Sequence, residues 1–185
     1  MEYTGLICTS YPDPKRAGKA IIRLYYQAGK QIRESCFDDE NGWYVRPSDD
    51  LVATNAKGRS PIAATNLNDG RKTSVFYLDD NNKLWRSTDN MVRGIVSYGD
   101  DGNWVATDAA IGDMLPGTSM CAISGSSQTR LFLQDKDGNV KDQTNSAYHR
   151  ITDRIKPYKA DSNAPITAIA WGYDTNHFEM RAFTL

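Results

Sequence analysis

Short apolar stretches alternate with polar, turn-forming residues along the whole chain. Residues 22–27, IRLYYQ, are mostly β-branched, aromatic or aliphatic with one charge among them, which favours a strand over a helix. Gly29 supplies a tight turn, and residues 31–37, QIRESCF, predict a second strand. Elsewhere, Gly, Pro, Asn-Asp or Asp-Gly interrupts every candidate helix after about eight to twelve residues. We therefore expect nearly all ordered structure to be antiparallel strand.

The register of this first strand pair decides which side chains share a face. If Gly29 and the next residue form a two-residue hairpin turn, Arg23 lies opposite Cys36 and Tyr25 lies opposite Glu34. Arg23 and Glu34 would then be diagonal neighbours on one face and form a charge-paired polar site. A shift of one residue would put them on opposite faces.

The strand pair recurs along the chain, each time after a short apolar strand: GLICTSY from Gly5, PIAATNL from Pro61, TSMCAIS from Thr118 and PITAIAW from Pro165. The repeat is about 45 to 58 residues long, close to the length of a propeller blade. We predict an all-β fold, a β-propeller of four-stranded antiparallel blades, with about three and a half blades in one domain. The blades are expected at about residues 5–58, 59–115, 116–162 and, in part, 163–185.

Composition excludes several classes of function. The chain has 185 residues, 39% of them hydrophobic, and 22 basic residues balance 23 acidic ones, so neither disorder nor a nucleic-acid partner is expected. No apolar run approaches the roughly 18 to 20 residues that span a bilayer, so no membrane partner is expected either. No secretion signal is evident, which predicts a cytoplasmic protein and leaves non-classical secretion open.

The titratable residues predict neither metal nor catalytic triad. The three cysteines, Cys8, Cys36 and Cys121, are odd in number and widely spaced, so we expect buried small side chains and neither disulfides nor a zinc site. His149 and His177 share no motif with a nucleophile. The segment around Asp137-Gly138 lacks the ligand series of a calcium loop and indicates a hairpin turn. No metal and no cofactor are expected.

The segments IRLYYQ, QIRESCFDDENGWYV and SPIAATNL resemble the repeats of the fungal fucose-specific lectins, the family of the Aleuria lectin, over residues 22–67. The resemblance implies a propeller with a sugar bound between neighbouring blades. An Arg from the second strand, a Glu from the third strand and aromatic residues from the next blade would hold that sugar. Arg23 and Glu34 match the first two positions.

Aromatic residues beside the turns are candidate platforms for the sugar. Trp104, in the next blade, is the candidate partner of Arg23 and Glu34, although it follows the third strand at a longer spacing than Trp43 does in the first blade. By the same resemblance, Phe37 and Trp43 would serve a site whose Arg and Glu lie on a preceding blade. A guanidinium and a carboxylate satisfy sugar hydroxyls, and an aromatic face accepts the apolar side of a deoxysugar.

The other repeats depart from this pattern. The second blade has Ser74 and Arg86 at the Arg and Glu positions, which cannot form the same pair, so no sugar site is expected there. The third blade has Arg130 and Asp142, a candidate ligand-binding pair whose carboxylate is one methylene shorter. If the chain is a lectin, replacing Arg23 with Ala should abolish most sugar binding and barely change stability.

Three functions remain open. The first is a lectin for fucose or a related deoxysugar. The second is an enzyme, because some proteins that look like this lectin fold act as dehydrating pericyclases, the hetero-Diels-Alderases of fungal terpenoid biosynthesis, where an Arg–carboxylate pair could serve as acid and base. The third is a scaffold without a small ligand. A partial propeller exposes unpaired edges, so we expect a homo-oligomer or completion by another chain.

Overall fold

The expected all-β fold is confirmed by a computed structural model. It describes residues 5–46, 50–67, 72–90, 104–125, 128–146, 151–153, 158–171 and 179–184, and these residues form strands and turns without a helix. Every strand pairing among them is antiparallel. Consequently, no described segment is a helix long and apolar enough to cross a membrane. The described residues also hold no cluster of three or more metal-ligating side chains.

The strands form four sheets in chain order. The first contains β1 (Leu6–Pro12), β2 (Ala20–Ala28), β3 (Gln31–Asp38), β4 (Gly42–Tyr44) and β5 (Leu51–Ala53), and the second contains β6 (Ile62–Leu67), β7 (Lys72–Leu78), β8 (Lys83–Asn90) and β9 (Trp104–Asp113). The third contains β10 (Cys121–Ser124), β11 (Gln128–Gln134), β12 (Asn139–Ser146), β13 (Ile151–Asp153) and β14 (Tyr158–Lys159), and the fourth contains β15 (Ile166–Trp171) and β16 (Glu179–Thr184). We call them blades 1 to 4.

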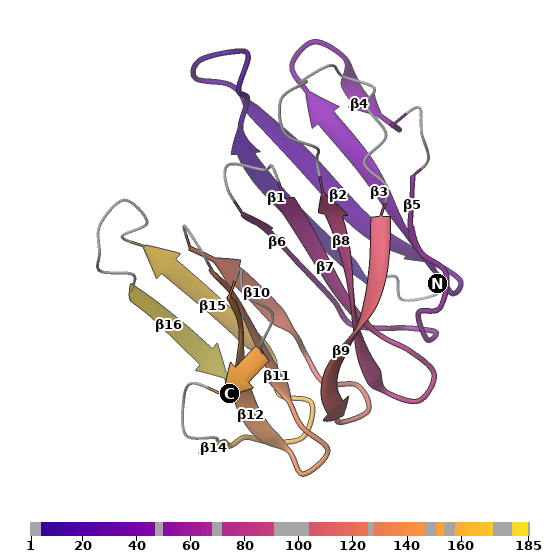
Figure 1. The fold of residues 1–185 in the computed structure, drawn as a ribbon, viewed down its shortest axis with the longest axis vertical. Helices are drawn as coiled ribbons and strands as arrows, with labels where there is room; N and C mark the ends of the chain where they lie inside the picture. Colours follow the sequence, from indigo (N-terminus) through magenta and orange to yellow (C-terminus); the bar gives the residue numbers. More distant parts are fainter. Residues whose placement is uncertain are drawn as a thin grey trace.

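The blades stand side by side through their first strands (Figure 1). β1 packs beside β6, β6 beside β10, and β10 beside β15, while the later strands of each blade lie farther out. In blade 1, β4 and β5 both pair with β3, so two short strands together make the fourth strand. β13 and β14 do the same beside β12 in blade 3. In this arrangement, one face of each blade lies against the next blade along the chain.

The predicted hairpin register is confirmed. Arg23 lies opposite Cys36 and Tyr25 lies opposite Glu34, around a turn in which Gly29 has a positive φ of 62°. That backbone conformation costs glycine little and other residues more. Blades 2 and 3 repeat the register, since Phe76 lies opposite Arg86 and Phe132 lies opposite Asp142. The same two positions in each blade therefore face the following blade.

Apolar side chains fill the three spaces between blades. Tyr25 and Ile32 of blade 1 pack against Val75 and Tyr77 of blade 2, and all four are fully buried. A second cluster joins blades 2 and 3, and a third joins blades 3 and 4 through Ile166. Burying a large apolar side chain contributes about 1.5 to 3 kcal/mol, so these clusters hold the blades in a fixed relation.

A buried glutamine links blade 1 to the start of blade 2, and another links blade 3 to the start of blade 4. The side chain of Gln27 donates to the Lys57 carbonyl at 2.6 Å and accepts from the Ser60 amide at 3.0 Å. The Gln134 side chain likewise donates to the Asp161 carbonyl at 2.8 Å and accepts from the Asn163 amide at 3.0 Å. These bonds tie the end of a second strand to the loop entering the next blade.

The structure corrects the expectation about the cysteines and adds detail to the expected turn at Asp137-Gly138. Cys36 is buried as expected, but Cys8 is exposed because it lies on the face of β1 that no described blade covers. The prediction of three buried cysteines was therefore wrong for Cys8, and Cys121 is only partly buried. The Asp137-Gly138 segment is a hairpin turn, in which Asp135 Oδ1 accepts hydrogen bonds from backbone amides. His149 and His177 lie outside the described residues.

Candidate functional site between blades 1 and 2

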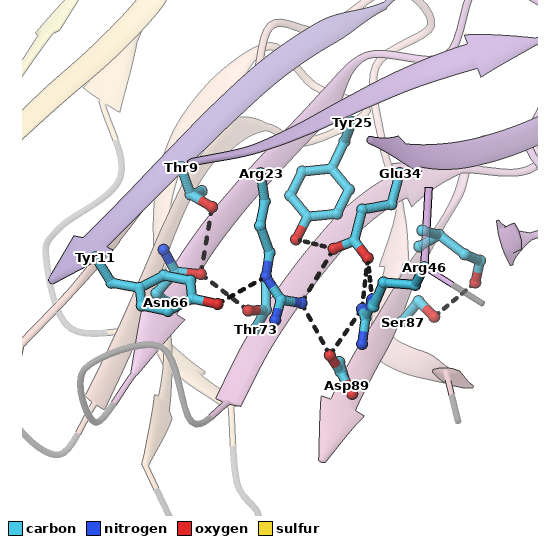
Figure 2. Close-up of polar contacts among 11 residues, drawn as sticks. Thr9, Tyr11, Arg23, Tyr25, Glu34, Arg46, Asn66, Thr73, Ser87 and Asp89 are labelled. Carbon is cyan, nitrogen blue, oxygen red and sulfur yellow. Dashed lines mark hydrogen bonds and ion pairs between the residues drawn. The ribbon is translucent and has the colours of Figure 1, made fainter. Parts of the chain in front are cut away.

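Arg23 and Glu34 meet on the face of blade 1 that turns toward blade 2 (Figure 2). Adjacent strands β2 and β3 carry them, and the confirmed register makes them diagonal neighbours. Arg23 Nη1 donates to Glu34 Oε1 at 3.1 Å. The pair expected from the sequence is therefore formed, and it lies between two blades.

Two further charged residues complete a four-membered cluster. Asp89, at the outer end of β8 in blade 2, accepts from Arg23 Nη1 at 3.0 Å through its Oδ2 atom. Arg46, just after β4, donates from Nε to Glu34 Oε2 at 2.6 Å and from Nη2 to Asp89 Oδ2 at 2.9 Å. We call Arg23, Glu34, Arg46 and Asp89 the charge cluster. Its two guanidinium groups and two carboxylates sum to zero charge.

Two tyrosines hold this cluster in place. Tyr25 donates its hydroxyl to Glu34 Oε1 at 2.8 Å, and the Tyr11 hydroxyl accepts from Arg23 Nε at 3.0 Å. Burial, reinforced by the Glu34 carboxylate, raises the pKa of Tyr25 well above its usual value. The Tyr25 hydroxyl therefore keeps its proton and remains a donor. Glu34 accepts hydrogen bonds on both carboxylate oxygens, which fixes the orientation of the group.

Electrostatics keep both arginines charged despite their burial. Burial by itself lowers the pKa of Arg23, but Glu34 and the neighbouring tyrosines raise it well above the ordinary value. For Arg46 burial also lowers the pKa, and Glu34 is the largest of the contributions that raise it overall. Both guanidinium groups therefore stay protonated at any physiological pH.

The charge cluster is almost sealed from solvent. Arg23 is 4% exposed, and Glu34 and Asp89 are each 1% exposed. Removing one partner of a buried ion pair costs about 3 to 5 kcal/mol, because the remaining charge stays buried without compensation. The burial of the pair therefore predicts that Arg23→Ala is strongly destabilising, in contrast to the expectation from the sequence that stability would barely change.

Trp104 lies at the wall of this cluster, at the start of β9 in blade 2. Its ring meets Tyr25 edge to face, with centroids 5.9 Å apart and planes at 88°. The guanidinium carbon of Arg46 lies over the same ring, 5.9 Å from its centroid. The structure thus brings together Arg23, Glu34 and Trp104, and it also places Arg46 on the Trp104 face.

Phe37 and Trp43 occupy the corresponding positions of blade 1. Phe37 lies opposite Trp43 on strands β3 and β4, just as Asp89 lies opposite Trp104 in blade 2. Their ring centroids are 5.4 Å apart, and Trp43 is 55% exposed. Both side chains are on the face of β3 opposite to Glu34, so they stay candidate platforms for a site on a preceding blade.

The space between blades 2 and 3 has different chemistry. Ser74 and Arg86 lie at the Arg23 and Glu34 positions, as the register shows. Burial and the nearby Arg86 lower the pKa of Lys72, which is on the same face. A guanidinium therefore replaces the carboxylate that would accept hydrogen bonds from sugar hydroxyls, in agreement with the sequence prediction that this copy lacks the pair.

Blade 3 carries a shorter version of the polar pair. Arg130 Nη1 donates to Asp142 Oδ2, so the shorter side chain still reaches its partner, and both residues are buried. The described side chains of blade 4 that pack on this side are aliphatic or a methionine: Ile166, Ala168, Ala170, Met180 and Ala182. Binding of a ligand by Arg130 and Asp142 stays a prediction, without an aromatic platform among these side chains.

Sequence reasoning missed Asp89, Arg46 and Tyr11. The sequence does contain a signal for Asp89. Aligning the repeats puts it at the position of Phe37, on the face of the third strand opposite to the polar pair. An acid at a position that is aromatic in blade 1 marks a change of chemistry. Tyr11 ends the first strand of the first repeat and Arg46 follows β4, and only the folded chain shows that they reach the cluster.

The comparisons with known proteins agree with this architecture. Residues 1–92 match the model of the fungal fucose-specific lectin family. A comparison with curated proteins found no match. Among solved structures, the SapL1 lectin, in complex with alpha methyl fucoside, has a TM-score of 0.74 at 21% identity, covering 98% of this chain and 55% of that chain. AofleA from Arthrobotrys oligospora has a TM-score of 0.72 at 15% identity, covering 99% of this chain and 54% of that chain.

The lectin of Aleuria aurantia, described as a six-bladed β-propeller with a fucose recognition mode, has a TM-score of 0.50 at 18% identity. The alignment covers 98% of this chain and 72% of that lectin. The chain spans about half the length of SapL1 and AofleA, so its four sheets correspond to part of a propeller. Residues 1–92, just under half of the chain, are therefore similar to the fungal fucose-specific lectin family.

Proposed function

We propose that the chain binds carbohydrate, namely fucose or a related deoxysugar, at the site between blades 1 and 2. The observation that carries the proposal is the meeting of Arg23, Glu34 and Trp104 at one inter-blade position. Arg23 and Glu34 lie within residues 1–92, which match the lectin family. The family match supports fucosylated glycans as partners. The comparisons add no support for the pericyclase alternative.

The chemistry of the site suits a neutral polyol. The charge cluster has no net charge, so it favours neither an anionic nor a cationic ligand. Its carboxylates accept hydrogen bonds and its guanidinium groups donate them, which together satisfy sugar hydroxyls. The indole face of Trp104 offers an apolar surface for the carbon side of a deoxysugar.

Arg46 has to leave the Trp104 ring for a sugar to stack there. Its side chain, 13% exposed, is the most exposed of the four charged side chains, and it follows the short strand β4. Its displacement would release Glu34 Oε2 as an acceptor. In this proposal the ligand takes over hydrogen bonds that Arg46 makes in the free protein.

Calorimetric titration with α-methyl-L-fucoside tests the proposal. The wild type should bind, and Arg23→Lys and Glu34→Gln should weaken binding at least about tenfold, because each loses a charge-assisted hydrogen bond worth about 1.5 to 3 kcal/mol. Arg33→Lys is the matched control. Arg33 is next to Glu34 on β3 but pairs with Asp50 on the opposite face, so the affinity should not change.

Two results would refute the proposed function. One is a wild-type protein that shows no heat of binding with millimolar fucoside. The other is an Arg23→Lys or Glu34→Gln protein that is folded by circular dichroism and binds as tightly as the wild type. Either result would favour a scaffold that uses the charge cluster only to join blades.

We also propose that another copy or another chain covers the free face of blade 4. Ile169 and Phe183 are 53% and 48% exposed there, on the side of β15 and β16 that faces away from blade 3. Adjacent exposed apolar side chains favour association. The proposal is consistent with the chain's corresponding to about half of SapL1 and AofleA.

A further inference from the structure

Two buried polar atoms at the site have no hydrogen-bond partner. Asp89 Oδ2 accepts from both arginines, but Asp89 Oδ1 accepts nothing in the part of the chain that the structure describes. The Trp104 indole Nε1–H donates to nothing there either. Buried polar groups nearly always have partners, so such a pair at one place calls for an explanation.

The two atoms come from side chains that face each other. Asp89 and Trp104 are directly opposite on the paired strands β8 and β9, so their side chains share one face of blade 2. Directly opposite residues have Cβ atoms about 4.5 to 5.5 Å apart. The two side chains are therefore neighbours, and one ligand could contact both residues.

The missing group must both donate and accept. Asp89 Oδ1 needs a donor, and the Trp104 N–H needs an acceptor. A hydroxyl supplies both from one oxygen, whereas an ammonium group only donates and a carbonyl only accepts. A sugar hydroxyl has this chemistry, and so does a water molecule.

We infer that Asp89 is a ligand-binding residue of this site, and that Asp89 Oδ1 and the Trp104 indole N–H read the same sugar hydroxyl. The inference rests on the proposed function. It adds a carboxylate to Arg23 and Glu34, at a position where blade 1 has Phe37. Asp89 then sets which hydroxyl pattern the site accepts.

Arg46 controls access to both atoms. Its guanidinium lies over the Trp104 ring and donates to Asp89 Oδ2, so it contacts each of the two residues. When Arg46 moves aside, the ligand meets Asp89 and Trp104 together. A sugar hydroxyl that hydrogen-bonds to both Asp89 and Trp104 partly compensates for the contacts that Arg46 loses.

The test measures the affinity of α-methyl-L-fucoside and of each of its mono-deoxy analogues for wild type, Asp89→Asn and Trp104→Phe. The wild type should bind one analogue at least about tenfold more weakly than the parent sugar. In Asp89→Asn the amide oxygen faces the two arginines, so its NH₂ group faces the ligand and cannot accept. Trp104→Phe keeps an aromatic ring but removes the donor.

Both variants should bind the parent fucoside at least about fivefold more weakly and lose their discrimination against the same analogue, to within about twofold. Trp104→Phe breaks no hydrogen bond in the free protein, so it stays informative if Asp89→Asn does not fold. Trp85→Phe is the matched control. The Trp85 indole donates to Asp79 Oδ2 at a distance of 2.9 Å and is not part of the site. Both the affinity and the discrimination should therefore be unchanged.

The outcomes separate this inference from the proposed function. If the wild type binds fucoside but the variants keep its discrimination, or lose it for two different hydroxyls, water serves the two atoms and only the inference is overturned. If the wild type binds no fucoside at all, the inference and the proposed function fall together.

Discussion

Arg23 shares its guanidinium between two carboxylates on different blades and a tyrosine hydroxyl. We predict that Arg23→Ala lowers the free energy of unfolding by about 3 to 5 kcal/mol, because Glu34 and Asp89 would stay buried with one cation between them. Urea unfolding of both proteins measures the difference. Arg33→Ala, which removes a more exposed pair with Asp50, should cost less than about 1 kcal/mol. Equal losses for the two variants would contradict a buried, interdependent cluster.

Cys36, beside Arg23 on the buried face of β3, makes stability fall at high pH. Burial, reinforced by the Glu34 carboxylate, raises the pKa of its thiol to about 12, whereas the unfolded chain ionises near the ordinary thiol value. The folded state thus keeps a proton that the unfolded state loses. The contribution is complete below about pH 9 and disappears as the pH rises toward 12.

Urea midpoints between pH 8 and pH 11 should therefore fall in the wild type and fall less steeply in Cys36→Ala. Part of the decline should persist, because burial also raises the pKa of Tyr77 to about 12. A thiol reagent at pH 8 should label exposed Cys8 in the folded protein and reach Cys36 only after unfolding. Identical pH slopes for the wild type and Cys36→Ala would show that the thiol is not responsible.

Single residues are where the sequence was least informative. Arg23 and Glu34 are 11 residues apart and share a hairpin, so local register alone brings them together. Asp89 contacts Arg46 across 43 residues and two blades, and no local pattern encodes that contact. The exposure of Cys8 likewise depends on which faces the neighbouring blades cover.

At the level of elements, the repeat determined most of what could be predicted. The second and third strands of blades 1 to 3 pair with one register, and alternation along them gives each position its face. The buried glutamine was not predicted, because blade 2 has Leu78 where blades 1 and 3 have Gln27 and Gln134. In the sequence alone, a glutamine at this otherwise apolar position indicates only the end of a strand. The structure is needed to show the backbone groups that it binds.

Gln134→Ala should lower the free energy of unfolding by about 2 kcal/mol or more. The substitution removes the hydrogen bonds of the buried Gln134 side chain to the Asp161 carbonyl and from the Asn163 amide, at about 0.5 to 1.5 kcal/mol for each bond, and leaves a cavity where the side chain was. Chemical denaturation measures the loss. Gln31→Ala is the control, because Gln31 is only partly buried and contacts Arg33 on its own strand, so its cost should stay near 0.5 kcal/mol. A comparable cost at both positions would show that Gln134 does not hold blade 4 in place.

At the level of the whole molecule, the four sheets form an arc, and no described blade covers the free face of blade 4 at one end of it. Ile169→Lys and Phe183→Lys should shift the protein toward a smaller species in sedimentation velocity, because a charge on the free face of blade 4 disfavours association. Asp137, an exposed residue in the turn between β11 and β12 of an inner blade, gives a control, because Asp137→Lys should leave the sedimentation coefficient unchanged. A wild type that sediments as a monomer at all concentrations would exclude a second copy as the partner that covers this face.

The arc also explains why the site depends on the fold as a whole. Blade 1 supplies Arg23 and Glu34, and blade 2 supplies Trp104, which lies after a longer connection than the one before Trp43. The sequence predicted that these three residues belong together through the family resemblance. Their contacts with Arg46, which holds the site closed in the free protein, needed the structure.

The indole N–H signals in a ¹⁵N-correlated NMR titration test the central claim most directly, because they report both the ligand and its location. The Trp104 signal is the one that Trp104→Phe removes. With α-methyl-L-fucoside it should move progressively and saturate, while the Trp85 signal, held by Asp79, should stay in place. If the Trp104 signal does not move at millimolar fucoside while the protein remains folded, no sugar occupies the site between blades 1 and 2, and the account is contradicted.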